Sequence, residues 1–243
     1  MNRFALFFLT ITLSTATAAA QPTFRLGVRG GFNRATSTLD AASTSLSSQY
    51  YYSANKSAIY AWQVGAVLEV EYHRFALQPA LLFSQKGEQF DTFNSFRSFG
   101  SFVPLQTFTV SRYNWLELPL NVVYTWHAVQ VFAGPYVALG IGGHQRGTVN
   151  NTYPVGILGF QKYDFAEKIS YGSNTENRRL DAGVNFGVGY RNGPLQVQLG
   201  CGLGLRNLHQ IDADATADSV HNFREDAAYN RVVQLTGTYF FQL

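Results

Sequence analysis

Three histidines are the first candidates for catalytic chemistry, because histidine is the commonest general base in enzymes. His144, His209 and His221 fall in segments that also contain serine and aspartate. An enzyme with a nucleophile would need one of these hydroxyls beside the base, in an arrangement fixed by a third group. No spacing among these residues matches a known catalytic set, and none has the short His-to-His interval of a metal-binding motif. We therefore expect no catalytic residue, no metal site and no cofactor.

Six glycines at alternate positions resemble phosphate-binding loops at first sight. They are Gly183, Gly187, Gly189, Gly200, Gly202 and Gly204. A phosphate loop follows a strand and begins a helix, whereas these glycines occupy one phase of segments that keep alternating. We expect them to relieve crowding between strands.

The elements that carry these residues follow a period of two, which is typical of strands with two different faces. The segments are residues 24–33, 60–72, 75–86, 116–125, 129–140, 180–191, 195–206 and 233–243. An even number of such segments is what a single-chain membrane barrel requires. An uncharged stretch at 118–143 is long enough for a membrane helix, but Pro119, Pro135 and the unbroken alternation oppose one.

The connections between these segments alternate between long and short. Long connections cover about residues 35–57, 87–107, 144–177 and 209–229, and short turns fall near His73, near His127 and at Asn192-Gly193. Outer-membrane barrels have long loops outside the cell and short turns in the periplasm. We predict an all-β fold, a closed eight-stranded antiparallel transmembrane β-barrel with four long extracellular loops and short periplasmic turns.

The N-terminus and the composition agree with export to a membrane. Residues 1–20 contain Arg3, an apolar run and a final Ala18-Ala19-Ala20, as in a signal peptide. We therefore divide the chain into a signal peptide, residues 1–20, and an outer-membrane barrel domain, residues 21–243. Charged residues make up only 14% of the chain and the net charge is +3, which gives no reason to expect nucleic-acid binding.

An eight-stranded barrel is just wide enough for side chains to fill, so we expect no open pore. The inward phase carries a cluster of charges, namely Arg25, Arg29, Glu69, Glu71, Lys86, Glu117, Arg179, Asp181 and Arg206. We expect these charges to pair with one another, since burying each alone would be costly. Asp181 and Arg206 are expected to lie opposite each other across the hairpin at 192–193. A proton or ion relay is the alternative, and nothing in the sequence selects it.

The second long connection contains a phenylalanine every three residues. The repeat consists of Phe90, Phe93, Phe96, Phe99 and Phe102. Exposed aromatic clusters can mark binding surfaces, so this repeat is our candidate loop binding surface. The alternative is that the rings pack on one another or cap the barrel mouth.

Four sequence motifs resemble the PorT-like small outer-membrane barrels of Bacteroidetes. They are the segments at residues 26–33 (LGVRGGFN), 77–87 (LQPALLFSQKG), 115–120 (WLELPL) and 132–136 (FAGPY). The resemblance implies an eight-stranded outer-membrane barrel inserted by the barrel-assembly machinery, and it implies little about activity. Such barrels usually end on an aromatic residue, whereas this chain ends on Leu243.

Together these patterns favour a monomeric, non-enzymatic outer-membrane protein with a structural or surface-binding role. Its expected partners are outer-membrane lipid, the barrel-assembly machinery, periplasmic chaperones and an unidentified partner of the loops. Two alternatives stay open: an outer-leaflet enzyme with its site at the loop rim, and a soluble lipocalin-like barrel with its apolar phase turned inward.

Overall fold

The computed structural model describes residues 22–38, 44–47, 50–98, 101–152, 160–171, 178–208 and 228–242. Within these residues ten strands pair antiparallel in one sheet. The strands are β1 Thr23–Ser37, β2 Thr44–Ser47, β3 Tyr50–Tyr72, β4 Phe75–Ser98, β5 Ser101–Trp126, β6 Val129–Thr152, β7 Phe160–Ile169, β8 Leu180–Asn192, β9 Leu195–Gly204 and β10 Asn230–Gln242.

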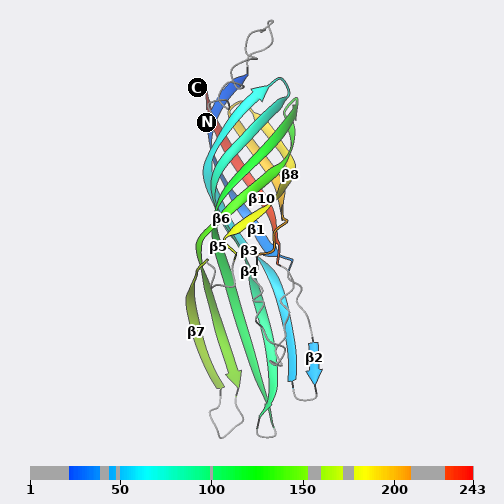
Figure 1. Cartoon of the computed structure of the whole chain (residues 1–243), viewed down its shortest axis with the longest axis vertical. Helices are drawn as coiled ribbons and strands as arrows, with labels where there is room; N and C mark the ends of the chain where they lie inside the picture. Colours follow the sequence, from blue (N-terminus) through cyan, green and yellow to red (C-terminus); the bar gives the residue numbers. More distant parts are fainter. Residues whose placement is uncertain are drawn as a thin grey trace, which may run out of the picture.

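Eight of the ten strands close into a ring (Figure 1). The order runs β1-β10-β9-β8-β6-β5-β4-β3, and β3 pairs again with β1, from Thr23 opposite Glu71 to Ala35 opposite Ile59. The other two strands lie outside the ring, β2 on β3 and β7 on β6. This confirms the predicted antiparallel eight-stranded barrel. The alternating sequence had given no indication of β2 or β7.

Three two-residue turns connect strands at one end, which we call the short-turn end. The turns are His73-Arg74, His127-Ala128 and Gly193-Pro194, and the first residue of each has a positive φ of 57° to 59°. The third turn lies one residue later than expected, because Asn192 still pairs with Leu195. Glycine accepts a positive φ freely, whereas proline cannot adopt one, so Gly193 must take the first turn position.

Four neighbouring strands continue far beyond the ring at the opposite end (Figure 1). Strands β3 to β6 are 23 to 26 residues long, about twice the length that a tilted strand needs to cross a bilayer. Much of the connection expected as a loop at 87–107 is therefore a paired hairpin of β4 and β5. Ladder hydrogen bonds do not require apolar alternation, which is why the polar sequence concealed this pairing.

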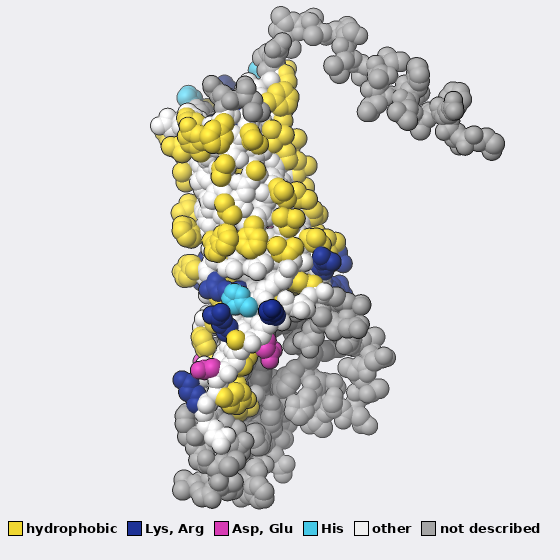
Figure 2. Space-filling view, turned by 90° about the vertical axis from the view of Figure 1, so that its left-hand side faces the viewer, with side chains coloured by type: hydrophobic (Ala, Val, Ile, Leu, Met, Phe, Trp, Pro, Cys, Tyr) yellow, Lys and Arg dark blue, Asp and Glu magenta, His cyan; other side chains and the backbone are white. Residues whose placement is uncertain are grey.

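The apolar phase of the strands faces outward. Phe32 is 71% exposed and Leu118 51% exposed, while their chain neighbours Asn33 and Glu117 are buried. These apolar side chains cover the outer wall of the barrel (Figure 2). A lipocalin-like barrel would need them inside, so the structure excludes that alternative.

Aromatic rings line the short-turn end of this apolar wall. Tyr72, Phe75 and Tyr190 are about half exposed, and the rings of Phe75 and Tyr124 lie 5.1 Å apart. Such a ring of aromatic residues is the girdle that outer-membrane barrels carry at the membrane boundary. No helix among the described residues is long and apolar enough to cross a membrane.

Candidate functional site

Near the short-turn end, Glu69 is the centre of a buried ion cluster inside the barrel. The carboxylate is fully buried and accepts hydrogen bonds at 2.8 Å from Arg25 Nη1 and from Arg191 Nη1. Arg25 also pairs with Glu71, which lies nearer the end of β3. The Arg191 guanidinium lies 5.0 Å from the ring centre of Phe240. This cluster links β1, β3, β8 and β10 inside the short-turn end of the barrel.

Sequence reasoning included Arg25, Glu69 and Glu71 in the lumen cluster but omitted Arg191. The sequence places Arg191 on the inward phase, ten residues after Asp181 on the same strand. That phase was the signal that could have added Arg191 to the cluster.

Uncharged amides continue the network across the barrel. Arg29 donates to Thr238 Oγ1 at 2.9 Å and to Gln78 Oε1 at 3.2 Å. Gln78 donates in turn to Glu69 Oε2 at 2.8 Å and to Gln196 Oε1 at 3.3 Å. Gln196 then donates to Gln130 Oε1 at 2.6 Å. The amides satisfy charges that would otherwise be costly to bury.

A second buried group lies closer to the long-strand end. Lys86 Nζ pairs with Glu117 Oε2 at 2.7 Å and lies 4.6 Å from the ring centre of Tyr136. The Tyr136 hydroxyl donates to Asp181 Oδ2 at 3.1 Å, and Asn230 donates to the same oxygen at 2.7 Å. Asp181 is thus held by two neutral donors, and it makes no ion pair with the other residues described here.

Two arginines expected in the lumen lie elsewhere. Arg179 and Arg206 are exposed at the mouth, and Arg206 does not pair with Asp181. The reason is that β8 begins at Leu180 and β9 ends at Gly204. The alternation of inward and outward side chains stops before it reaches either arginine.

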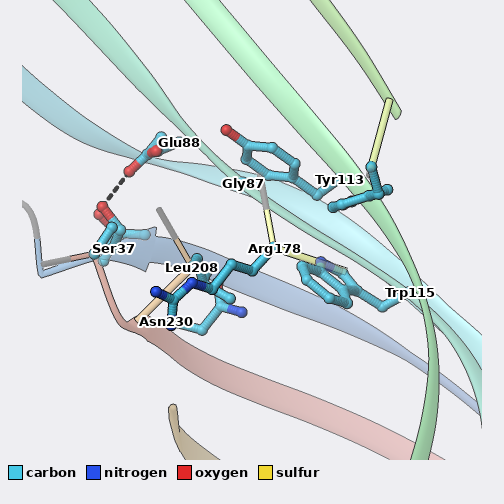
Figure 3. A pocket seen from close by; sticks show the side chains of 11 residues that line it. Ser37, Gly87, Glu88, Tyr113, Trp115, Arg178, Leu208 and Asn230 are labelled. Atoms are coloured by element: carbon cyan, nitrogen blue, oxygen red, sulfur yellow. Dashed lines mark hydrogen bonds between the residues drawn. The ribbon is translucent and has the colours of Figure 1, made fainter. Parts of the chain in front are cut away.

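A small pocket lies at the long-strand mouth, where side chains from several strands converge (Figure 3). Its volume is about 20 Å³, which is enough for roughly one water molecule. Two buried polar atoms at this pocket, Trp115 Nε1 and the Tyr171 hydroxyl, have no hydrogen-bond partner among the described atoms. Burial raises the pKa of the Tyr171 phenol. The pocket has room for about one water molecule, whereas an organic substrate would not fit.

The phenylalanine repeat does not form one surface. Phe90 and Phe93 lie three residues apart on β4 and therefore on opposite faces of the sheet. Phe96 lies in β4 and Phe102 in β5, but their side chains, like the whole of Phe99, fall outside the described part of the structure.

Phe93 instead joins aromatic residues of the neighbouring strands. Its ring lies 6.1 Å from that of Tyr51, and Phe108 of β5 lies diagonally across the β4–β5 ladder from it. The three rings are each about 40% exposed. We call this set of Tyr51, Phe93 and Phe108 the aromatic patch. The sequence analysis did not include Phe108, because it used the three-residue spacing of the phenylalanines and not the alternation of side chains between the two faces of a strand.

The rim histidines do not assemble a catalytic group in the described structure. His144 lies on β6 between Arg112 of β5 and Lys168 of β7. His209 and His221 fall outside the described residues. Among the residues that are described, no three His, Cys, Asp or Glu side chains are placed to hold a metal ion.

A closed antiparallel ring with an apolar exterior and a polar, filled interior defines a transmembrane β-barrel. Residues 19–210 match the family described as outer membrane protein beta-barrel domain. The chain belongs to this family, and its place is the cell outer membrane. Its short-turn end is accordingly the periplasmic end, and its long-strand end is the extracellular end.

Comparison with solved structures gives distant similarities. Neisserial surface protein A is 8% identical with a TM-score of 0.35, over 90% of this chain and 97% of that one. The attachment invasion locus protein Ail of Yersinia pestis, solved with the heparin analogue sucrose octasulfate, is 8% identical with a TM-score of 0.35, over 91% and 99% of the two chains. A comparison with curated proteins found no match.

Proposed function

We propose that this barrel is a non-enzymatic surface protein that binds a partner outside the cell through the extended sheet of β3 to β7. The observation that carries the proposal is the continuous pairing of β4 with β5 to Ser98 opposite Ser101. Paired strands hold side chains in fixed positions, whereas a loop would have to be ordered on binding at an entropic cost.

The aromatic patch is the part of this sheet that we propose as the contact. Aromatic side chains supply large contact areas at interfaces. Phe93 and Phe108 lie beside Gln106 and Asp91, which hydrogen-bond to each other at 3.1 Å. An apolar centre with a polar margin is the usual arrangement of a protein surface that binds a partner.

The filled lumen supports a role that needs no passage of solutes. Buried pairs occupy the barrel at the levels of Glu69, Gln78 and Glu117. The pocket at the mouth has room for about one water. Transport through the barrel and hydrolysis of a large substrate at this pocket are therefore both disfavoured.

We also propose that the chain is a PorT-like barrel, exported by its signal peptide, inserted as a monomer by the assembly machinery and aided by periplasmic chaperones. The four motifs support this, because several buried groups of the lumen lie within them. Arg29 and Asn33 come from the first motif, Gln78 and Lys86 from the second, and Trp115 and Glu117 from the third.

The test is binding of cells that display the full chain to an array of immobilised glycans and extracellular proteins. We expect at least one probe to bind, and Phe93→Ser/Phe108→Ser to abolish that binding. Tyr163→Ser is the matched control, because this exposed ring lies on the opposite face of the sheet. If no probe separates the double variant from wild type, the aromatic patch is not the contact.

The enzymatic alternative needs a separate measurement. The purified barrel in vesicles is incubated with phospholipid and with casein, and hydrolysis is followed. We expect no turnover. Turnover that is lost in His144→Ala would overturn the non-enzymatic assignment.

A further inference from the structure

Three basic residues form a row on the outer face of the extracellular sheet. Arg112 of β5 lies directly opposite His144 of β6, and His144 lies directly opposite Lys168 of β7. Residues that face each other in a ladder point to the same side of the sheet. Arg146 lies on the same face of β6, two residues further out than His144.

This face is the continuation of the lipid-facing wall. Leu116 is exposed on the outer face of β5, and the β4–β5 register runs without a shift from Leu116 to Arg112. Four residues of a tilted strand cover a height of about 10 Å. The basic row therefore begins just beyond the apolar wall, at the level of lipid headgroups.

The acidic side chain on this face of β7 is Asp164, and its carboxylate accepts a hydrogen bond from Thr148 Oγ1 at 2.6 Å instead of pairing with the row. Neither Arg112, Arg146 nor Lys168 takes part in an ion pair with a described residue. Arg112 is nevertheless held in place, because it donates to the Tyr60 carbonyl at 2.8 Å. Like charges on adjacent strands destabilise a sheet, so an external anion would relieve this cost.

The same level carries basic residues around the rest of the barrel. Arg34, Arg179 and Arg231 are exposed, each within two residues of the last outward apolar side chain on β1, β8 and β10 respectively, and Arg206 is exposed next to Leu205, just after β9. Figure 2 shows Lys and Arg side chains gathered directly beyond the apolar wall at the extracellular end. Patches of one charge next to a membrane attract lipid headgroups of the opposite charge.

We propose that Arg112, His144, Arg146 and Lys168 form a binding site for the phosphate groups of outer-leaflet lipid. Arginine forks and lysine ammonium groups are the usual ligands of phosphate. A lipid is favoured over a soluble anion because the row is continuous with the lipid-facing wall, where acyl chains would lie against Leu116 and Ile141. This inference does not depend on the aromatic patch or on its partner.

The test is a titration of the folded full chain in detergent with bisphosphorylated lipid A, read by native mass spectrometry. We expect a stable complex with phosphorylated lipid A and none with dephosphorylated lipid A. Arg146→Gln and Lys168→Gln should each weaken binding about fivefold, the usual effect of one cation near an anionic headgroup. Higher salt should weaken binding as well, because the contacts are exposed.

Two matched variants separate the site from a general charge effect. Arg74→Gln removes one exposed positive charge at the opposite, periplasmic end, and it should bind as wild type does. Lys168→Arg keeps the charge and should retain affinity. Heat-modifiable mobility in gels checks that each variant is folded.

Three results would overturn the proposal. The first is equal binding of phosphorylated and dephosphorylated lipid A. The second is a loss in Arg74→Gln that equals the loss in Arg146→Gln. The third is binding of inorganic phosphate or dextran sulfate at least as tightly as lipid A, which would mark the row as a site for soluble anions.

Discussion

Glu69 is the residue on which the periplasmic ion cluster depends. It accepts from two arginines and one glutamine while fully buried. Glu71 lies two residues away and pairs with one of the same arginines, but its side chain is 30% exposed. The two carboxylates therefore allow a direct comparison of a buried and a partly solvated ion pair.

We predict that Glu69→Gln destabilises the barrel by about 3 kcal/mol, because it leaves two largely buried guanidinium groups, Arg25 at 21% and Arg191 at 14% exposed, without their shared carboxylate. Glu71→Gln should cost less than about 1 kcal/mol, since water can solvate what remains. Urea unfolding of the barrel in vesicles measures both. Equal losses in the two variants would show that burial does not decide the strength of these pairs.

Lys86 and Glu117 provide a second test at this scale. Lys86→Met should destabilise by about 3–5 kcal/mol, because Glu117 stays buried without its cation. The double variant Lys86→Met/Glu117→Gln should regain most of that loss, as the two effects are coupled rather than additive. The same unfolding measurement applies, and purely additive effects would mean that the 2.7 Å contact carries no coupling.

At the level of strands, two glycines make room for an aromatic side chain in the lumen. Gly187 and Gly200 face each other across β8 and β9, and Phe132 of β6 lies over both. A Cβ at Gly200 would lie 2.8 Å from the Phe132 ring, whereas a Cβ at Gly237 would meet nothing within 4 Å. These glycines relieve crowding, as the sequence led us to expect.

We predict that Gly200→Val impairs folding while Gly237→Val does not. The added methyl groups would overlap the Phe132 ring in the first case, and overpacking of this kind costs about 1–3 kcal/mol or more. In the second case they would extend toward lipid. The fraction of protein that shows heat-modifiable mobility after refolding measures the difference. Equal yields would mean that the ring can move aside.

The strands of the barrel could be predicted from sequence, but their extensions could not. Between Phe75 and Leu81 an apolar residue alternates with a small or polar one, because the lipid and the lumen favour different side chains on the two faces of the strand. From Gln89 to Ser98 both faces meet polar surroundings, so the alternation disappears while the pairing continues.

The lumen charges could be predicted as a group, but their partners could not. Arg25 and Glu69 are directly opposite in the β1–β3 register, and the sequence predicted both as members of the lumen cluster. The pairing of Glu69 with Arg191 crosses the barrel, and it depends on ring closure rather than on neighbouring strands. Alternation alone contains no information about contacts across the lumen.

At the scale of the whole molecule, the membrane barrel does not need the extracellular sheet in order to close. Ring closure is complete without the outer parts of β4 and β5, since β3–β4 and β5–β6 pairing continues through the membrane segments. We predict that a chain with residues 90–109 replaced by Asn-Gly still inserts and closes, because Gln89 then stays opposite Val110. It should still migrate faster unheated than boiled, whereas failure to do so would show that the hairpin is needed for folding.

The filled lumen predicts the electrical behaviour of the molecule. Purified wild-type barrel in a planar bilayer should give no conductance steps, because buried side chains occupy the interior at several levels. Steady open channels would show that the lumen rearranges in the membrane.

Strands β4 and β5 run unbroken from the periplasmic turns to the far tip of the extracellular hairpin. A partner that pulls on this tip would load the two strands along their length. Ladder hydrogen bonds lie across that direction, so those that join the hairpin to β3 and β6 would be sheared together instead of being opened one after another. The hairpin would therefore act as a stiff tether, and tension at the cell surface would pass directly into the wall of the barrel.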